Sequence, residues 1–473
     1  MNYGRQRIYT DATVITKDNV ADEVRKALLV HDSNRADIDT LYGILRGKTA
    51  ILGKVKEIRE EINHKICENR AFEIVSFYTG YIFGEPIQYV RRENPPAGAA
   101  DDETAKEINS LNGFMSLAGK AAVDARIAKW MLIGGLGYRL ELPNKAWTKG
   151  GDEAPSKVYA LDPRNTFVVY SNSVDETPMM AVHYVEREHG ERVFGVYTAT
   201  AYFEFTEFEA NVVEEGHTLG MIPIVEYSAD FSRLGVFEVV VDQLNALNEL
   251  QSNRMDDIVQ FVNSFLAVLG GELDEETYKK LNDWKTLCLP EGTDAKYLSA
   301  SLSQADVQTL KDDIVQAIFE ICGVPNRNGN GASTSDNGVA VLLRDGYTAA
   351  EARAKNIEEN WKESEMLSLR LTLRIIRDTE GTSLRLSDIK PHFTRRNYEN
   401  IATKSQVLIA MLNNPWVHPE VAYASCGMFP DPESAYLQGK SWKEEQDKKA
   451  AAEMEQYVKS LGDDDADAVQ QDG

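Results

Sequence analysis

Residues 237–265, FEVVVDQLNALNELQSNRMDDIVQFVNSF, carry the most regular apolar pattern of the sequence. Their apolar side chains recur every three or four residues, at Phe237, Val240, Leu244, Leu247, Ile258, Phe261 and Phe265. That spacing places them on one face of an α-helix. At a rise of 1.5 Å per residue, such a helix is a rod about 40 Å long. The sequence therefore predicts a long amphipathic helix at the centre of the chain.

A second amphipathic helix is predicted from Asp306 to Cys322, after a mixed, turn-rich insert. Two helices that bracket a small insert predict a hairpin-like stalk with a knob at its tip. The polar side of this stalk is acidic. Its carboxylates include, on the first helix, Glu238, Asp242, Glu249, Asp256 and Asp257, and, on the second, Asp312 and Asp313.

The chain before the stalk is predicted to change from helix to sheet. Apolar residues recur at helical spacing from about Lys17 to Ile87, with Ile62 and Ile66 counted on the apolar face. A further helix is expected from about Thr104 to Met131. Between residues 132 and 227 the period becomes two, in six or seven short runs separated by turn residues. This pattern is typical of an antiparallel sheet or sandwich.

The chain after the stalk is predicted to be a polar loop followed by helices. Residues 326–338, NRNGNGASTSDNG, contain no apolar anchor and are expected to form a flexible loop. A helix of about 40 residues follows, from Val339 to Asp378, with Gly346 as a candidate kink point. More helix is expected up to residue 461, and the acidic tail 462–473 is expected to be disordered.

Charge and composition limit the kinds of function. The 473 residues hold 51 Lys and Arg against 75 Asp and Glu, a net charge of −24. Such a surface argues against tight binding of DNA or anionic lipid. No window is apolar enough for a membrane span, and the N-terminus has no targeting segment.

Signatures of catalysis are missing from the sequence. The Gly-rich loop lacks the Gly-Lys-Ser/Thr step of a phosphate-binding loop, and no G-x-S-x-G elbow occurs. Seven histidines and four scattered cysteines show no metal-ligand spacing. We therefore expect no catalytic residues, no metal and no cofactor. A hydrolase that uses unrecognised carboxylates stays open as an alternative.

Five segments, in the same order along the chain, resemble portal proteins of tailed double-stranded DNA phages of the siphophage type. They cover about residues 35 to 445 and include ENRAFEIVSFYTGYIFGEPIQYV (68–90), ALDPRNTFVVYSN (160–172), LGMIPIVEYSADFSRLGVFEVVVDQLNALNELQSNRMDDIVQF (219–261), IFEICGVPNRNGNGASTSDNGVAVLLR (318–344) and HFTRRNYENIATKSQVLIAML (392–412). Asp336-Asn337-Gly338-Val339-Ala340 stands where that family usually has Ser-Gly-x-Ala.

The resemblance implies an α+β, mainly helical, elongated subunit. Its parts would be a wing (1–235, β-rich at 132–227), two stem helices (236–263 and 306–323), a small α/β clip (264–305), a tunnel loop (324–338), a long kinked wing helix (339–384), a helical crown (385–461) and the acidic tail (462–473).

The resemblance also implies the function. The subunits would form a homododecameric ring at one vertex of the capsid in the virion, after assembly in the host cytoplasm. Double-stranded DNA would pass through the channel transiently and without sequence preference during packaging and ejection. Partners would be the terminase large subunit, the head-completion adaptor, and the major capsid and scaffolding proteins, with no membrane involved. Another acidic, scaffold-like capsid-associated protein is the alternative.

Three groups of residues are candidates for this role. The stalk carboxylates named above would form an acidic wall that repels the duplex; an ordinary solvated helix face is the alternative. The tunnel loop would contact DNA through Asn326, Arg327, Asn328, Asn330, Ser333 and Ser335; a surface loop is the alternative. The clip would dock terminase and adaptor through Lys279, Lys280, Trp284 and Lys285; a local core for the insert is the alternative.

Overall fold

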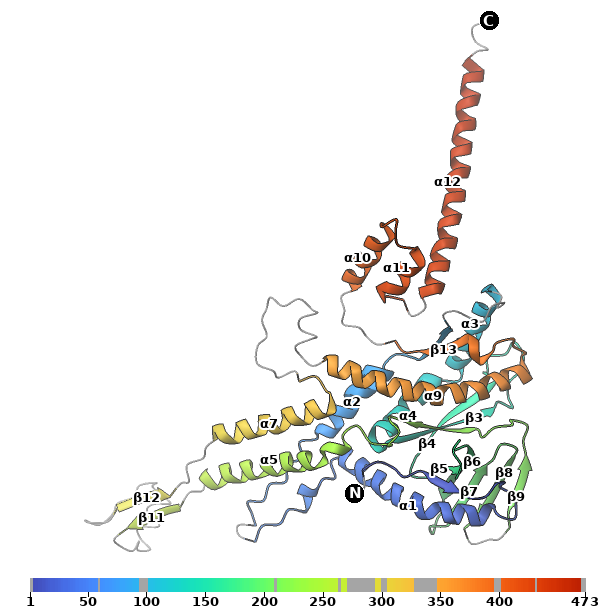
Figure 1. Cartoon of the computed structure of the whole chain (residues 1–473). Helices are drawn as coiled ribbons and strands as arrows, with labels where there is room; N and C mark the ends of the chain where they lie inside the picture. The colour runs from blue at the N-terminus through green and yellow to red at the C-terminus, as the bar shows by residue number, and fades with distance from the viewer. Residues whose placement is uncertain are drawn as a thin grey trace.

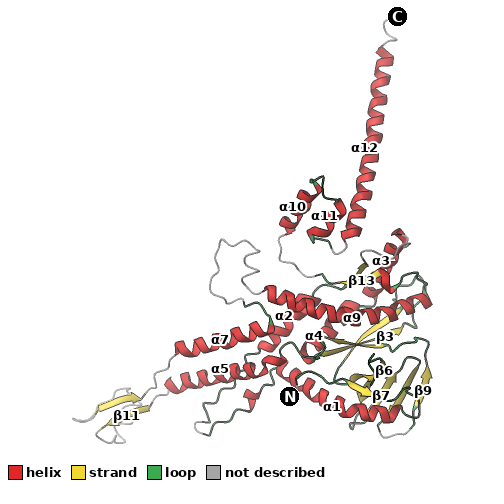
Figure 2. Cartoon of the chain, viewed as in Figure 1, coloured by secondary structure: helices red, strands yellow, loops and turns green. Residues whose placement is uncertain are grey.

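The structure is a computed structural model, and it describes residues 3–57, 60–92, 101–207, 211–262, 265–269, 294–298, 304–326, 347–394, 401–429 and 432–468. They form a body of helices and sheets, an arm of two helices that ends in a pair of strands, and a helical C-terminal part (Figure 1). Figure 2 shows the helices and the strands of the body, with the two-helix arm extending to one side. None of the helices in the described ranges has a stretch long and apolar enough to cross a membrane.

The N-terminal part of the body is helical, as the sequence predicts, but it is not continuous. Helix α1 (Val20–Leu45) is followed by a short 3-10 turn, η1 (Ala50–Gly53), and then by α2 (Arg70–Phe83). The side chain of Asn69 caps α2 by accepting a hydrogen bond from the backbone N–H of Phe72 at 3.1 Å. The expectation of helix is wrong for residues 54–57 and 60–69, because backbone N–H groups of this part of the chain, such as that of His64, bond to side chains of another helix.

The β-rich region forms two sheets in the body, together with one strand from the N-terminus. The larger sheet has the order β1-β5-β6-β7-β8-β9, in which β1 pairs parallel to β5 and the other pairs are antiparallel. The smaller sheet has the order β10-β3-β4. The strands are β1 (Ile8–Thr10), β3 (Leu136–Pro143), β4 (Ser156–Leu161), β5 (Thr166–Ser171), β6 (Pro178–Glu186), β7 (Arg192–Tyr197), β8 (Ala201–Thr206), β9 (Val213–Gly216) and β10 (Ile224–Ser228).

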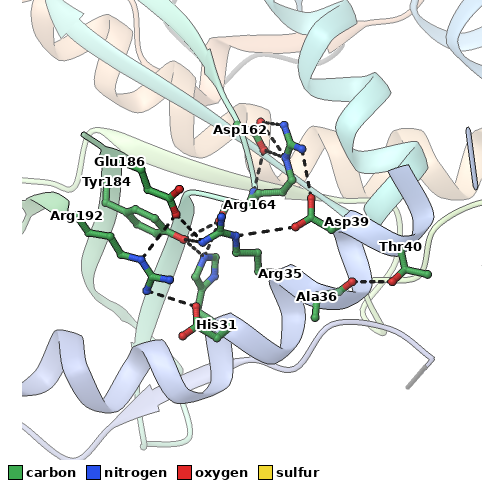
Figure 3. A network of polar contacts seen from close by, with 11 residues as sticks. His31, Arg35, Ala36, Asp39, Thr40, Asp162, Arg164, Tyr184, Glu186 and Arg192 are labelled. Atoms are coloured by element: carbon green, nitrogen blue, oxygen red, sulfur yellow. Dashed lines mark hydrogen bonds and ion pairs between the residues drawn. The ribbon is translucent and has the colours of Figure 1, made fainter. Parts of the chain in front are cut away.

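A polar network joins α1 to the larger sheet (Figure 3). Arg164, in the turn between β4 and β5, pairs with Asp162 at 2.6 Å and donates to Asp39 of α1 at 3.2 Å. Its carbonyl oxygen accepts hydrogen bonds from Tyr184 at 2.9 Å and from the His31 ring at 3.0 Å. Burial lowers the pKa of His31 to about 4, so this ring is neutral at pH 7 and acts as a structural donor.

Helix α9 (Tyr347–Thr379) packs across the body and matches the end of the long helix that the sequence predicts. Its predicted first residues, 339–346, and the kink point Gly346 lie outside the described residues. Trp361 of α9 is fully buried against Phe83 and Tyr227, with ring centroids 4.5 and 4.4 Å away. The body's largest apolar cluster joins α1, α2, α4 (Lys120–Gly134), the base of the arm and α9.

The boundary between body and C-terminal part lies later than the sequence predicts. Strand β13 (Ile389–His392) pairs antiparallel with β2 (Gln88–Arg91), and Ile389 is buried with residues of α3 (Asp101–Leu117) and α9. Residues 385–392 therefore belong to the body, because this strand needs β2 to complete its hydrogen bonds. The helices after it are α10 (Ile401–Leu412), α11 (Pro419–Cys426) and α12 (Pro432–Ala468), and α12 extends into the predicted tail.

Candidate functional site

The arm is the predicted hairpin-like stalk. Helix α5 (Val241–Val262), preceded by the 3-10 turn η2 (Glu238–Val240), runs outward, and α7 (Gln304–Cys322) returns beside it (Figure 1). At the body end, Leu244 and Leu247 of α5 are buried in one apolar cluster with Ile318 of α7. Further out, Arg254 donates to Gln308 of α7 at 2.9 Å. The predicted stem helices are therefore present, with bounds within a few residues of expectation.

Five of the seven predicted stalk carboxylates are exposed. They are Asp242, Glu249 and Asp257 on α5, and Asp312 and Asp313 on α7. Helix α7 adds Asp306 and Glu320, which are exposed and lie seven residues before and after Asp313. Because seven residues make nearly two helical turns, these three acids form one stripe along the stalk. The stalk thus has an acidic surface on both helices.

Glu238, by contrast, is an internal anchor. Its side chain is fully buried and forms an ion pair with Arg5, which is also buried. The two carboxylate oxygens also accept backbone N–H bonds from Gly4 at 3.0 Å and Gly235 at 2.9 Å. The prediction that Glu238 lies on a solvated wall is wrong, because its charge is used to tie the N-terminus to the start of the stalk.

Asp256 is the second carboxylate that the sequence misplaces. It is fully buried. Its carboxylate forms ion pairs with Lys54 at 2.8 Å and Lys56 at 2.7 Å. The backbone N–H and the ring of His64 both lie within hydrogen-bond distance of it, at 2.8 Å. Burial acts to raise the pKa of Asp256, but these donors outweigh it and hold the pKa below its ordinary value. Asp256 is therefore charged yet hidden from solvent, and it cannot belong to an acidic wall.

The end of α7 leads into the predicted tunnel loop and is fixed to α2. The hydroxyl of Tyr78 donates to the carbonyl oxygen of Cys322 at 2.7 Å and lies 3.2 Å from that of Gly323. Gly323 has a φ of +67°, the left-handed conformation that ends many helices. Burial raises the pKa of the Cys322 thiol to about 11, so this cysteine is a structural and not a reactive group.

The start of α9 is also fixed to α2. The hydroxyl of Tyr81 donates to Glu351 of α9 at 2.9 Å, and its ring lies 6.5 Å from that of Tyr347. One face of α2 thus holds both the point where the chain leaves the stalk and the point where it enters α9. Of the six loop residues predicted to contact DNA, Asn326 alone lies in the described part of the chain. The others, Arg327, Asn328, Asn330, Ser333 and Ser335, lie outside it.

The tip of the stalk carries two short strands, β11 (Phe265–Leu269) and β12 (Asp294–Leu298), which pair antiparallel. Two paired strands agree with the expectation of a small folded knob. The predicted docking residues Lys279, Lys280, Trp284 and Lys285 lie outside the described residues. Among the described residues, no cluster of three or more His, Cys, Asp or Glu side chains could hold a metal ion.

Sequence reasoning missed the residues that hold the stalk in place. Lys54, Lys56 and His64 lie about 190 to 200 residues before their partner Asp256. Arg5 lies more than 230 residues before Glu238. No local spacing signals such pairs. The local signal on α5 is the spacing of three polar residues, Asn248, Ser252 and Asp256, which lie four residues apart. The structure shows that all three are buried.

Comparison with known proteins gives one match that covers nearly the whole chain. The family model described as "Phage portal protein, SPP1 Gp6-like" matches residues 27–457. No curated protein matches the sequence.

Solved structures that are similar to the chain include two from gene transfer agent particles. One is a chain of "Neck of native GTA particle computed with C12 symmetry", with 14% identity, a TM-score of 0.43, and coverage of 76% of this chain and 89% of that one. The other is a chain of "Virion of native gene transfer agent (GTA) particle", with 14% identity, a TM-score of 0.44, and coverage of 83% and 94%.

Proposed function

The chain belongs to the phage portal proteins of the SPP1 Gp6-like family and has that family's portal function at the capsid vertex. We propose that about twelve copies of it form a ring, and that their stalks line a channel for double-stranded DNA. The observation that carries the proposal is the acidic surface of the stalk. Asp242, Glu249 and Asp257 on α5, and Asp312 and Asp313 on α7, are all exposed.

An acidic wall suits a conduit because DNA must move through it without being held. Each Lys or Arg that fixes a phosphate releases counterions and strengthens binding. A ring of carboxylates does the opposite and repels the duplex toward the axis of the channel. Glu238 and Asp256 are buried, so they do not take part in this wall. The wall is formed by the five exposed acids together with Asp306 and Glu320 of α7.

The remaining parts of the proposal rest on the family and the sequence. The tunnel loop, with Arg327 as its single cation, would touch passing DNA. The clip, with Lys279, Lys280, Trp284 and Lys285, would dock the terminase large subunit and later the head-completion adaptor. The ring would assemble in the host cytoplasm with the major capsid and scaffolding proteins. The chain itself would have no catalytic role, since the terminase supplies the ATPase.

Charge reversal on the stalk tests the acidic wall. In the variant Asp312→Lys/Asp313→Lys, we expect purified rings to bind duplex DNA at low salt more tightly than the wild type, with a steeper dependence on salt. Packaging in infected cells should yield fewer filled capsids. A matched control is Glu214→Lys/Glu215→Lys on β9, which makes the same change of charge at exposed residues away from the stalk.

The control decides between a wall and a general charge effect. In the β9 variant, DNA binding should depend on salt no more steeply than in the wild type, and DNA packaging should be normal. Equal DNA binding and equal loss of packaging in the two variants would contradict a special role for the stalk acids.

A further inference from the structure

Between residues 248 and 260, where the side chains of α5 are described, no apolar side chain is fully buried. Leu247 is the last fully buried apolar residue along the part of α5 whose side chains are described. Beyond it the buried side chains are all polar, namely those of Asn248, Ser252 and Asp256. Met255 and Ile258, at the same level, are each 39% exposed. In this described part of the helix, the fully buried contacts are therefore made by polar side chains.

The buried polar face of α5 is occupied by the extended segment 64–68. Three of its backbone N–H groups donate to side-chain oxygens of α5. The pairs, with their N···O distances, are His64 with Asp256 at 2.8 Å, Ile66 with Ser252 at 2.9 Å, and Glu68 with Asn248 at 2.8 Å.

This ladder follows from the matching of two periods. Alternate residues of an extended chain are about 6.6 Å apart, and every fourth residue of a helix is about 6 Å further along its axis. Residues 64, 66 and 68 can therefore pair in turn with 256, 252 and 248, with the two segments running in opposite directions. Each N–H that would otherwise be left without a partner finds one acceptor on α5.

The ends of the ladder are fastened to the rest of the molecule. Glu68 accepts from Gln251 of α5 at 2.7 Å and pairs with Lys311 of α7 at 3.2 Å, so it holds both stalk helices. The next residue, Asn69, donates to the carbonyl oxygen of Leu45 at 2.8 Å and caps α2. The segment thus connects the stalk to two helices of the body.

We propose that the extended segment 64–68 sets the direction in which the stalk leaves the body, with Asn248 and Ser252 as positioning residues for the channel. The proposal rests on the channel role given above, because it explains how the exposed acids of α5 are held in place. Without the three hydrogen bonds of this segment, the outer half of α5 would be free to change its direction relative to the body.

The test uses the full chain with the variant Asn248→Ala/Ser252→Ala, which removes two acceptors of the ladder. Spin labels at Asp257→Cys on α5 and Val174→Cys in the body report the angle of the stalk, with Cys67 and Cys288 replaced by serine and labelled chains diluted in unlabelled ones. We expect the distribution of label distances to broaden about twofold, and the amides of Ile66 and Glu68 to exchange hydrogen at least tenfold faster.

Two single variants show whether the acceptor itself matters. Ser252→Thr keeps the acceptor oxygen, so its distribution of label distances should match that of the wild type. Ser252→Ala removes the oxygen, so its distribution should be broader. Ser252 also donates to the carbonyl oxygen of Asn248, four residues earlier, at 2.7 Å. Thr309→Ala on α7 is the matched control, because Thr309 makes the same kind of bond to Ala305, at 3.0 Å, and none of the described bonds joins it to segment 64–68. Ser252→Ala also covers the case in which the double variant does not fold.

The outcomes separate this inference from the channel role. An unchanged distance distribution in Ser252→Ala, or equal effects of Ser252→Ala and Thr309→Ala, would overturn the positioning role whatever the packaging result. A broadened distribution together with fewer filled capsids supports both. A broadened distribution with normal packaging upholds the positioning by segment 64–68 and contradicts the need for a fixed acidic wall.

Discussion

Asp256 illustrates how one residue can secure the arm of this molecule. It is a fully buried carboxylate that receives Lys54, Lys56 and His64 from a segment far away in the sequence. A charge in such a position is stable only because its donors replace the water that it loses. The same donors hold its pKa below the ordinary value.

Asp256→Asn keeps the shape of the side chain and removes its charge. We expect it to lower the free energy of unfolding at pH 7 by about 2–3 kcal/mol, as for a lost hydrogen bond to a charged group. Urea denaturation of the full chain measures this. The exposed neighbour provides the control, since Asp257→Asn should change the free energy of unfolding by less than about 0.5 kcal/mol.

The pH dependence of this difference gives an independent check. A carboxyl whose pKa is lower when folded contributes stability above its unfolded pKa, about 3.9, and loses it as the pH falls through the folded value. The gap between wild type and Asp256→Asn should therefore shrink below about pH 4. A gap of the same size at pH 7 and at pH 3 would contradict the role of the charge.

Elements of the body are joined by a second buried ionic cluster. Glu365 of α9 lies 2.9 Å from Lys120 at the start of α4 and 2.9 Å from Arg139 of β3. It also accepts from Tyr89 of β2 at 2.5 Å and from Tyr227 of β10 at 3.1 Å. Burial acts to raise the pKa of Glu365, but Arg139 and Lys120 keep it below the ordinary value. Four elements thus meet on one side chain of α9.

Glu365→Gln should separate α9 from these elements. It leaves Arg139 and Lys120 buried with less negative charge, so we expect a loss of about 3–5 kcal/mol in the free energy of unfolding. Thermal denaturation of the full chain measures the loss. Glu359→Gln is the control, because Glu359 is 72% exposed and pairs only at the surface with Lys362. Similar losses in the two variants would show that the buried cluster does not join the elements.

Elements with a regular period could be predicted from the sequence, and those held by distant partners could not. The stalk helices follow from apolar residues three and four apart, and the strands of 136–228 follow from alternation. Residues 54–69 mislead the same reasoning. Ile62 and Ile66 have helical spacing, but the N–H of Ile66 bonds to Ser252, 186 residues away. Spacing along the chain carries no information about such a partner.

The candidate site shows the same division. Five exposed carboxylates could be predicted because a solvated helix face is a local property. Glu238 and Asp256 could not, because their burial depends on Arg5 and on the segment that contains Lys54. The sequence likewise assigns residues 389–392 to the C-terminal helical part, whereas the structure shows them as strand β13, paired with β2 of the body. Contacts between distant segments decide each of these cases.

At the scale of the whole molecule, the order of segments was more informative than any one motif. The family match over residues 27–457 confirms the portal family that the order of segments indicated. The net charge of −24 argues against tight binding of DNA by the general surface, and it agrees with the proposed channel that lets DNA slide. The elongated subunit, with its acidic stalk between body and tip, has a shape that fits the proposed ring of copies around an axis.

Electron microscopy of the purified protein would show directly whether the subunits form a ring. We predict ring-shaped particles with a central hole at least as wide as a DNA duplex, about 20 Å, and a mass close to twelve subunits. The stalks should line the hole, and rings should persist in the variant with reversed stalk charges. Discrete monomers or open filaments at every protein concentration would contradict the account.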